Sequence, residues 1–155
     1  MKRSLFYYKT KIGEIGILDN GNAITNVSFG RIANEGADIR ETTLIKDASK
    51  QLNEYLSGQR KIFDITLELS GTDFQKKVWK ALQEIPYGEV CTYKDIAIKI
   101  GNINSCRAVG MANNKNPLPI VIPCHRVIGA NGKLIGYAGG LTIKEMLLKL
   151  EEQVR

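Results

Sequence analysis

Along residues 1–70, the spacing of apolar side chains changes from the alternation of strands to the spacing of a helix and back again. Residues 4–30 place apolar side chains at alternate positions in short runs, which predicts strands, and Asp19-Asn20-Gly21-Asn22 predicts a hairpin turn between two of them. Leu44 to Leu56 instead follow helical spacing, and residues 61–69 return to strand alternation. These segments predict a small α/β scaffold, in which we find no candidate chemistry.

Helical spacing dominates the rest of the chain, residues 71–155, after a boundary at Ser70-Gly71. Thr72 and Gln75 have the spacing of a capping box, in which the two side chains bond each other's backbone N–H, and they predict a helix that begins there. The pattern therefore predicts two lobes, residues 1–70 and residues 71–155.

Two short helices joined by a tight turn are predicted next. Thr92 and Ser105 can each cap a helix, and Gly101-Asn102 supplies the turn, a layout typical of a helix-turn-helix. The second helix has small residues and a single cation, Arg107, before Lys115. Such a narrow helix could approach a nucleic-acid groove closely, or it could simply pack tightly against another helix, and the pattern favours neither.

The chain ends with a predicted hairpin and a predicted helix. Val127 to Tyr137 alternate around Asn131-Gly132, a favoured turn dipeptide, and a hairpin there would form the wing of a winged helix. Thr142 and Glu145 predict a second capping box at the start of the last helix. The fold class expected is therefore α+β, a small α/β lobe followed by a winged helix-turn-helix-like lobe.

Charge is distributed unevenly between the two predicted lobes. The net charge is +6, and residues 1–70 hold ten Lys and Arg against nine Asp and Glu, whereas residues 71–155 hold twelve against seven. A basic second lobe favours a polyanionic partner such as nucleic acid.

The cysteines and the N-terminal residues indicate the cell compartment in which we expect the protein. Three widely spaced cysteines do not make a disulfide framework, and a single histidine without a Cys-x-x-Cys pair makes a zinc site improbable. The N-terminus has no signal-peptide pattern, and no run approaches the length of a membrane span. We therefore expect a cytoplasmic protein without metal, cofactor or membrane contact.

The candidate chemistry lies where the only histidine follows a cysteine, in Pro123-Cys124-His125. Cysteine attacks as a thiolate, and histidine handles protons near neutral pH, so the pair could be a nucleophile and its base. The pair by itself is more often an inert core cysteine beside a structural histidine, and the surrounding residues have to decide. Because neighbours in a strand point to opposite faces, the two can cooperate only if the chain turns at Pro123 or a water bridges them.

Glu151 stands in the apolar stripe of the last predicted helix, with Ile143 and Leu147. A carboxylate there is costly unless it is paired or reaches water. It could lie at the edge of the stripe and reach solvent, or it could meet His125 and orient the imidazole ring, as a third group orients the base behind a nucleophile.

From about Thr72 to Glu151 the sequence resembles a known family. The matching residues lie in seven segments: Pro86-Tyr87-Gly88-Glu89-Val90, Tyr93, Arg107-Ala108-Val109-Gly110, Asn116-Pro117, Ile122-Pro123-Cys124-His125-Arg126-Val127, Gly136-Tyr137 and Gly139-Gly140-Leu141. These motifs resemble those of the O6-alkylguanine-DNA alkyltransferases. The first lobe resembles that family in length and layout only, and residues 1–90 hold neither the cysteines nor the histidines with which other members bind zinc there.

The resemblance implies a chemical role for five residues. Cys124 would take an alkyl group from O6 of guanine, possibly also from O4 of thymine, in one irreversible step. His125 would deprotonate it through a water, with Glu151 behind it. Asn116 would brace the active-site turn, and Tyr93 would help to extrude the nucleotide and donate to its base.

The resemblance also implies how DNA is held. Arg107 would fill the place of the flipped nucleotide, and the partner would be double-stranded DNA bearing O6-alkylguanine, bound from its minor groove by a monomer without an obligate protein partner. Three residues would face the DNA and three would line the base pocket: Lys94, Asn102 and Ala130 for the first set, Val127, Tyr137 and Ala138 for the second.

Two other functions remain open at this point. A damage-binding DNA module without transfer would share the fold, although family-like proteins of that kind lack the reactive cysteine. A Cys-His hydrolase of small esters or amides would turn over without DNA, which a basic helix-turn-helix lobe does not favour.

Overall fold

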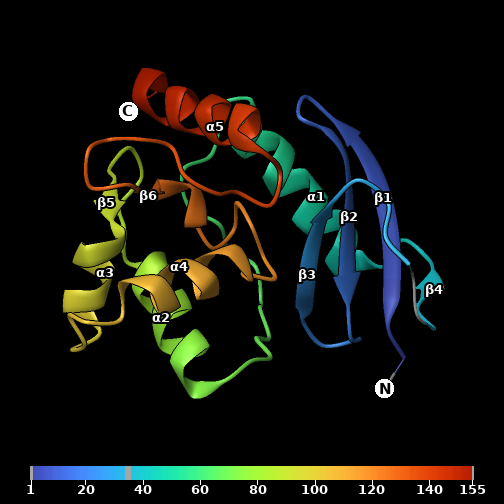
Figure 1. Ribbon diagram of the computed structural model, residues 1–155. Helices are drawn as coiled ribbons and strands as arrows, with labels where there is room; N and C mark the ends of the chain where they lie inside the picture. Colours follow the sequence, from blue (N-terminus) through green and yellow to red (C-terminus); the bar gives the residue numbers. More distant parts are fainter. Residues whose placement is uncertain (1, 34–35, 155) are drawn as a thin grey trace. The chain divides into compact units, whose positions relative to one another are not determined.

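A computed structural model describes residues 2–33 and 36–154, and within it the chain forms two compact units, Met1–Ser70 and Gly71–Arg155 (Figure 1). We call them the N-terminal unit and the C-terminal unit and describe each by itself. In residues 2–33 and 36–154, no helix has both the length and the apolar character needed to cross a membrane.

The N-terminal unit is a four-stranded sheet with one helix, and the alternating pattern predicted the three strands between residues 4 and 30. The strands are β1 (Ser4–Thr10), β2 (Gly13–Asp19), β3 (Ile24–Phe29) and β4 (Asp38–Ile39), in the order β3-β2-β1-β4. Neighbours β1, β2 and β3 pair antiparallel, and β4 adds to β1 in parallel. The predicted turn at residues 19–22 connects β2 and β3, where the Asn20 side chain accepts from the backbone N–H of Asn22 and Ala23.

Helix α1 (Thr43–Leu56) closes the core of this unit. Thr42 caps it by accepting from the Ile45 N–H, and the buried face of the helix includes Ile45, Leu52 and Tyr55. These side chains and the apolar residues of β2 are removed from water almost completely, which is the main favourable term in holding the unit together.

The strand predicted for residues 61–69 was wrong. Only Leu67 forms a bridge, to Ile24, through bonds from the Ile24 N–H to Thr66 and from the Glu68 N–H to Ile24. Every second residue of the segment is nonetheless half-buried. Alternating burial requires only that one side of the segment pack against the protein, whereas a strand requires a series of backbone bonds to a neighbour.

The C-terminal unit is mainly helical. Its elements are α2 (Asp73–Gln83), β5 (Cys91–Thr92), α3 (Tyr93–Lys99), α4 (Cys106–Asn114), the 3₁₀ turn η1 (Cys124–Arg126), β6 (Val127–Ile128) and α5 (Leu141–Val154). The capping box predicted at Thr72 and Gln75 is confirmed at the start of α2. Thr92 caps α3 as predicted, and it does so in a capping box with Asp95 that the sequence analysis did not name.

Helices α3 and α4 form the helix-turn-helix-like pair. Gly101 has a φ of +82°, a left-handed conformation that glycine adopts without strain, and it turns the chain between them. Ser105 precedes α4 as predicted, but its hydroxyl donates to the Asn102 carbonyl in the turn instead of capping the helix. Behind the pair, Trp79 of α2 is buried and its indole N–H donates to Ala112 of α4 at 2.9 Å.

The predicted wing is not a two-stranded hairpin in the described residues. A turn closes where Gly129 donates to the Lys133 carbonyl, but β6 pairs in parallel with β5 instead of with residues 133–137 (Figure 1). The winged detail therefore stays a prediction, while the α+β class is confirmed.

The second predicted capping box, at Thr142 and Glu145, was wrong. Helix α5 begins at Leu141, so Thr142 already lies inside it. The carbonyl of Gly140 accepts the first helical bond, from the Lys144 N–H, so Gly140 occupies the capping position, two residues before Thr142.

Candidate active site

A sharp turn presents Cys124 and His125, and the bonds around it fix its shape. The Asn116 amide donates to the Ile122 carbonyl at 2.9 Å and accepts from the Leu118 N–H at 2.9 Å. Ile120 has a φ of +74°, a left-handed conformation that costs a β-branched residue of order 1–3 kcal/mol. Such a strained backbone persists only because the buried surroundings enforce it, so the turn is rigid.

The chain turns directly after Pro123, as cooperation between Cys124 and His125 required. Residues Cys124–Arg126 form a single 3₁₀ turn, closed by the Arg126 N–H bond to the Pro123 carbonyl. Adjacent residues in such a turn no longer point to opposite faces, so the two side chains are not forced apart as they would be in a strand.

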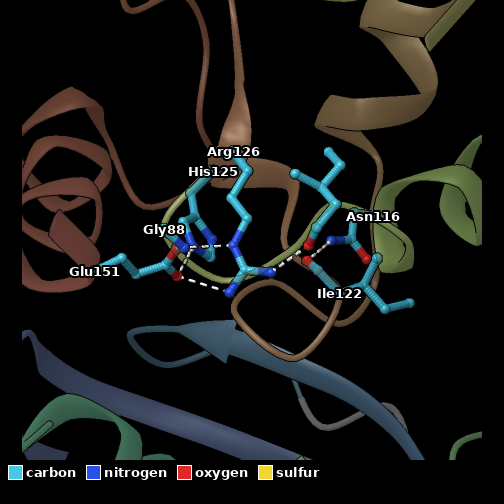
Figure 2. A network of polar contacts seen from close by, with 7 residues as sticks. Gly88, Asn116, Ile122, His125, Arg126 and Glu151 are labelled. Atoms are coloured by element: carbon cyan, nitrogen blue, oxygen red, sulfur yellow. Dashed lines mark hydrogen bonds and ion pairs between the residues drawn. The ribbon is translucent and has the colours of Figure 1, made fainter. Parts of the chain in front are cut away.

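The structure brings His125 and Glu151 together. Glu151 lies on α5, and its Oε2 is 2.7 Å from His125 Nε2, with both side chains buried (Figure 2). The alternative in which Glu151 reaches solvent at the edge of the stripe is excluded, since the residue is only 1% exposed. A neutral imidazole that donates Nε2–H to this carboxylate carries its lone pair on Nδ1.

Glu151 also has two partners that the sequence analysis missed. Arg126 donates to both carboxylate oxygens, from Nε to Oε1 at 2.8 Å and from Nη2 to Oε2 at 2.9 Å, and the Gly88 N–H donates to Oε1 at 3.0 Å. Figure 2 shows these groups converging on one carboxylate. A buried carboxylate is tolerable only when it is paired and hydrogen-bonded, and the N–H groups of His125, Arg126 and Gly88 provide such bonds.

Burial keeps the Cys124 sulfur protonated. It raises the pKa of the thiol from 9 to about 11, although the hydrogen bond with Asn116 and the nearby charge of Lys144 act in the opposite direction. At neutral pH the resting residue is therefore a thiol, which is a weak nucleophile, and reaction requires a base.

His125 is neutral at the same pH and can serve as that base. Burial lowers the pKa of its imidazole below the ordinary value, and Glu151 opposes this shift by stabilising the charged ring. The carboxylate thus supports the imidazolium that forms when a proton arrives, while burial keeps the ring ready to accept it.

The residues predicted to line the base pocket differ in burial. Val127 is buried directly after η1, Tyr137 is half-buried and Ala138 is exposed. Tyr93 at the start of α3 donates its hydroxyl to the Ile135 carbonyl at 2.9 Å. The pKa of this phenol is raised, mainly by burial and further by the charge that Cys124 would carry as a thiolate.

The residues predicted to face DNA are all exposed. They lie on α3, in the turn, on α4 and in the loop after β6: Lys94, Asn102, Arg107 and Ala130. The structure does not bring them into the buried cluster of Cys124, His125 and Glu151, and a surface position is what contact with a macromolecule requires.

Lys144 is a further residue that the sequence analysis missed. It is fully buried on α5 and donates to three backbone carbonyls, those of Val127, Ile135 and Gly136. A signal was present, because Lys144, Leu147 and Glu151 are spaced i, i+3 and i+7 and so share one helical face. Within residues 2–33 and 36–154, no group of three metal-binding side chains is present.

The fold and this site together define a class of protein in which a buried cysteine, beside a paired histidine and carboxylate, lies in a unit with a helix-turn-helix-like pair. Comparison with known proteins is more specific. Residues 73–153 match the model for the 6-O-methylguanine DNA methyltransferase, DNA binding domain, and residues 5–69 match the model for its ribonuclease-like domain.

Relatives cover nearly the whole chain. The methylated-DNA--protein-cysteine methyltransferase of Methanosarcina barkeri is 51% identical over 148 residues, which are 93% of this chain and 94% of the relative. The protein of the same name in Mycobacterium tuberculosis is 44% identical over 154 residues, which are 96% of this chain and 93% of the relative.

A solved structure agrees with this. The crystal structure of Mycobacterium tuberculosis OGT in complex with DNA superposes with a TM-score of 0.91 at 42% identity, covering 97% of this chain and 94% of that one. The chain therefore belongs to the 6-O-methylguanine DNA methyltransferase family.

Proposed function

We propose that this protein is a methylated-DNA–protein-cysteine methyltransferase, which repairs DNA by moving an alkyl group from O6 of guanine to its own Cys124. The observation that carries the proposal is the buried thiol next to His125, whose ring is held by Glu151 at 2.7 Å, in a chain of this family. DNA binding follows from the family and from a relative solved with DNA.

The transfer is a single displacement at carbon. His125 takes the thiol proton through a bridging water, and the Cys124 sulfur attacks the alkyl carbon. The S–C bond forms as the C–O6 bond breaks, and the electron pair of that bond stays on guanine, which ends with the proton that the thiol lost. The thioether product has no leaving group that water could readily replace, so each molecule acts once.

The pKa order of the two groups explains why the thiol is stable until a substrate arrives. Because burial raises the pKa of Cys124 to about 11 and lowers that of His125, the resting proton stays on sulfur. The charged pair, thiolate and imidazolium, forms only with support from Glu151 behind the ring and Lys144 near the sulfur. A buried, protonated thiol avoids oxidation and stray alkylation in the meantime.

The exposed face of α4 provides the DNA contact in this proposal. A base inside a duplex is inaccessible to a buried sulfur, so it must be flipped out at a cost of a few kcal/mol. Arg107 is exposed on α4 and would enter the vacated stack, which offsets part of that cost. The small residues beside it allow the helix to approach the minor groove closely, and Lys94, Asn102 and the Ala130 N–H would contact the backbone.

The extruded base would enter beside Tyr93. Its hydroxyl would donate to the base, Tyr137 would line the pocket, and backbone groups near Val127 and Ala138 would read the edge of the guanine.

The N-terminal unit acts as a scaffold. Three free cysteines, of which Cys124 must stay reduced, suit the cytoplasm.

Mass spectrometry tests this function directly. Protein incubated with duplex containing O6-methylguanine should gain the mass of one methyl group, located on Cys124, and the Cys124→Ala variant should gain none. Cys106→Ala is the matched control, because Cys106 is partly exposed on α4 and should leave transfer unchanged. Repeated turnover by one molecule, or an unmodified Cys124 after saturating damaged duplex, would refute the proposal.

The alternative of a damage-binding module without transfer is less well supported. Such a module has no need for a cysteine held beside a histidine and a carboxylate that are both buried. Burying a carboxylate is costly unless it is paired, and its pairing with the imidazole next to Cys124 favours a role in moving a proton.

A further inference from the structure

Lys144 is buried in the C-terminal unit, and a charge near the sulfur does not by itself require the three backbone bonds that its side chain makes. It lies in the first turns of α5, where the helix dipole disfavours a cation, and it is 0% exposed. Neither local helix preference nor solvation accounts for a lysine there, so its tertiary contacts must.

Those contacts match the donors of an ammonium group. The Nζ atom lies 2.7 Å from the Val127 carbonyl, 3.0 Å from that of Ile135 and 3.3 Å from that of Gly136. Lysine has three N–H donors, and each therefore has an acceptor. Val127 directly follows the active-site turn, so Lys144 ties that turn to residues 135–136, which lie next to the predicted pocket residue Tyr137.

The Ile135 carbonyl is shared between two donors. Tyr93 donates its hydroxyl to this oxygen at 2.9 Å, and Lys144 donates to it at 3.0 Å. If the Tyr93 hydroxyl turns to a base in the pocket, a carbonyl with no other protein donor would have to turn to water instead. With Lys144 in place the oxygen keeps a charged donor, and the hydroxyl is released at little cost.

We propose that Lys144 is a positioning residue that holds the Ile135 carbonyl while the Tyr93 hydroxyl moves from that oxygen to the extruded base. The proposal rests on the function proposed above, because it assigns Tyr93 to the substrate. The charge of Lys144 also favours the reactive state. Burial lowers the pKa of its ammonium group and a thiolate at Cys124 raises it, so the cation is better stabilised when the nucleophile is charged.

A double-mutant cycle tests the exchange. Single-turnover transfer from duplex with O6-methylguanine is measured for the protein itself, for Tyr93→Phe, for Lys144→Met and for the double variant. Tyr93→Phe should slow transfer about tenfold, the value of one hydrogen bond. In the Lys144→Met background the same substitution should slow it less than about threefold, because there the hydroxyl stays on Ile135.

Lys149→Met is the matched control, since Lys149 is on the same helix and its side chain is 67% exposed. In that background Tyr93→Phe should keep its full effect. Equal effects of Tyr93→Phe with and without Lys144 would overturn the proposal, because a lysine that only stabilises the fold gives additive costs. Absence of transfer in the unaltered protein would instead refute the proposed function.

A second measurement does not depend on how Lys144→Met folds. In the Cys124→Ser protein, the ammonium NMR signal of Lys144 should be detectable as a slowly exchanging, buried group. It should persist when duplex with O6-methylguanine binds, while the signal of the Tyr93 hydroxyl or ring shifts. Loss of the Lys144 signal on binding would show that the lysine, and not the tyrosine, leaves Ile135, and would contradict the exchange.

Discussion

Replacing Glu151 by glutamine tests the charge cluster behind Cys124. The bonds described for the carboxylate come from N–H groups: Gly88 and Arg126 Nε on Oε1, and His125 and Arg126 Nη2 on Oε2. A glutamine must place an NH₂ group at one of the two oxygen positions. Whichever it is, two donors then face a donor, and the buried guanidinium loses its counter-charge.

The magnitude follows from that geometry. Breaking a buried charge pair by removing one partner costs about 3–5 kcal/mol of unfolding free energy. For a chain of this size that corresponds to a fall in melting temperature of roughly 6–20 °C. Transfer should also slow by about a hundredfold or more, because Glu151 raises the pKa of His125 and its loss makes the imidazole a weaker base.

The assay combines urea unfolding, followed by the fluorescence of buried Trp79, with single-turnover transfer from damaged duplex. Glu145→Gln is the control, since Glu145 lies on the same helix, its side chain is 55% exposed, and its pair with Lys149 should contribute less than about 1 kcal/mol. Adding Arg126→Met to Glu151→Gln should cost less than Arg126→Met alone, because the charge it removes is already unpaired. A Glu151→Gln protein as stable as Glu145→Gln would refute this reasoning.

Three further predictions concern the turn, the thiol and the DNA face. Arg107→Ala should slow transfer from duplex far more than transfer from free O6-benzylguanine, and equal slowing of both rates would remove its role in the stack. Because the pKa of Cys124 is about 11 in the folded protein against 9 for an ordinary thiol, the protonated thiol should contribute up to about 3 kcal/mol to the unfolding free energy below pH 9, and this contribution should be lost between pH 9 and 11. Urea unfolding at both pH values measures the loss, which Cys124→Ala should lack. Asn116→Ala removes the bonds to Ile122 and Leu118 and raises the pKa of the thiol further, so transfer should slow and its alkaline limb should move to higher pH; an unchanged pH profile would contradict the contact with sulfur.

Local signals in the sequence were sufficient where the deciding contacts lie within a few residues. The capping box at Thr72, the cap at Thr92 and the turn at Gly101 formed as predicted, because each depends on residues only a few positions apart. The predictions at Thr142 and at residues 61–69 were wrong because contacts outside the local pattern decided the structure there. A neighbouring glycine carbonyl started α5 earlier, and no partner was in place to pair with residues 61–69 beyond Ile24.

The sequence by itself determined the chemistry of this protein: a cysteine followed by its only histidine, and a carboxylate in an apolar stripe that had to be paired if it was buried. Only the tertiary structure decided how that pairing is made. Arg126 and Gly88 meet Glu151 across 25 and 63 residues, and Lys144 reaches Val127 across 17. Contacts at such separations depend on how helices and turns pack, and hydrophobic periodicity along one element does not specify which polar groups the packing brings together.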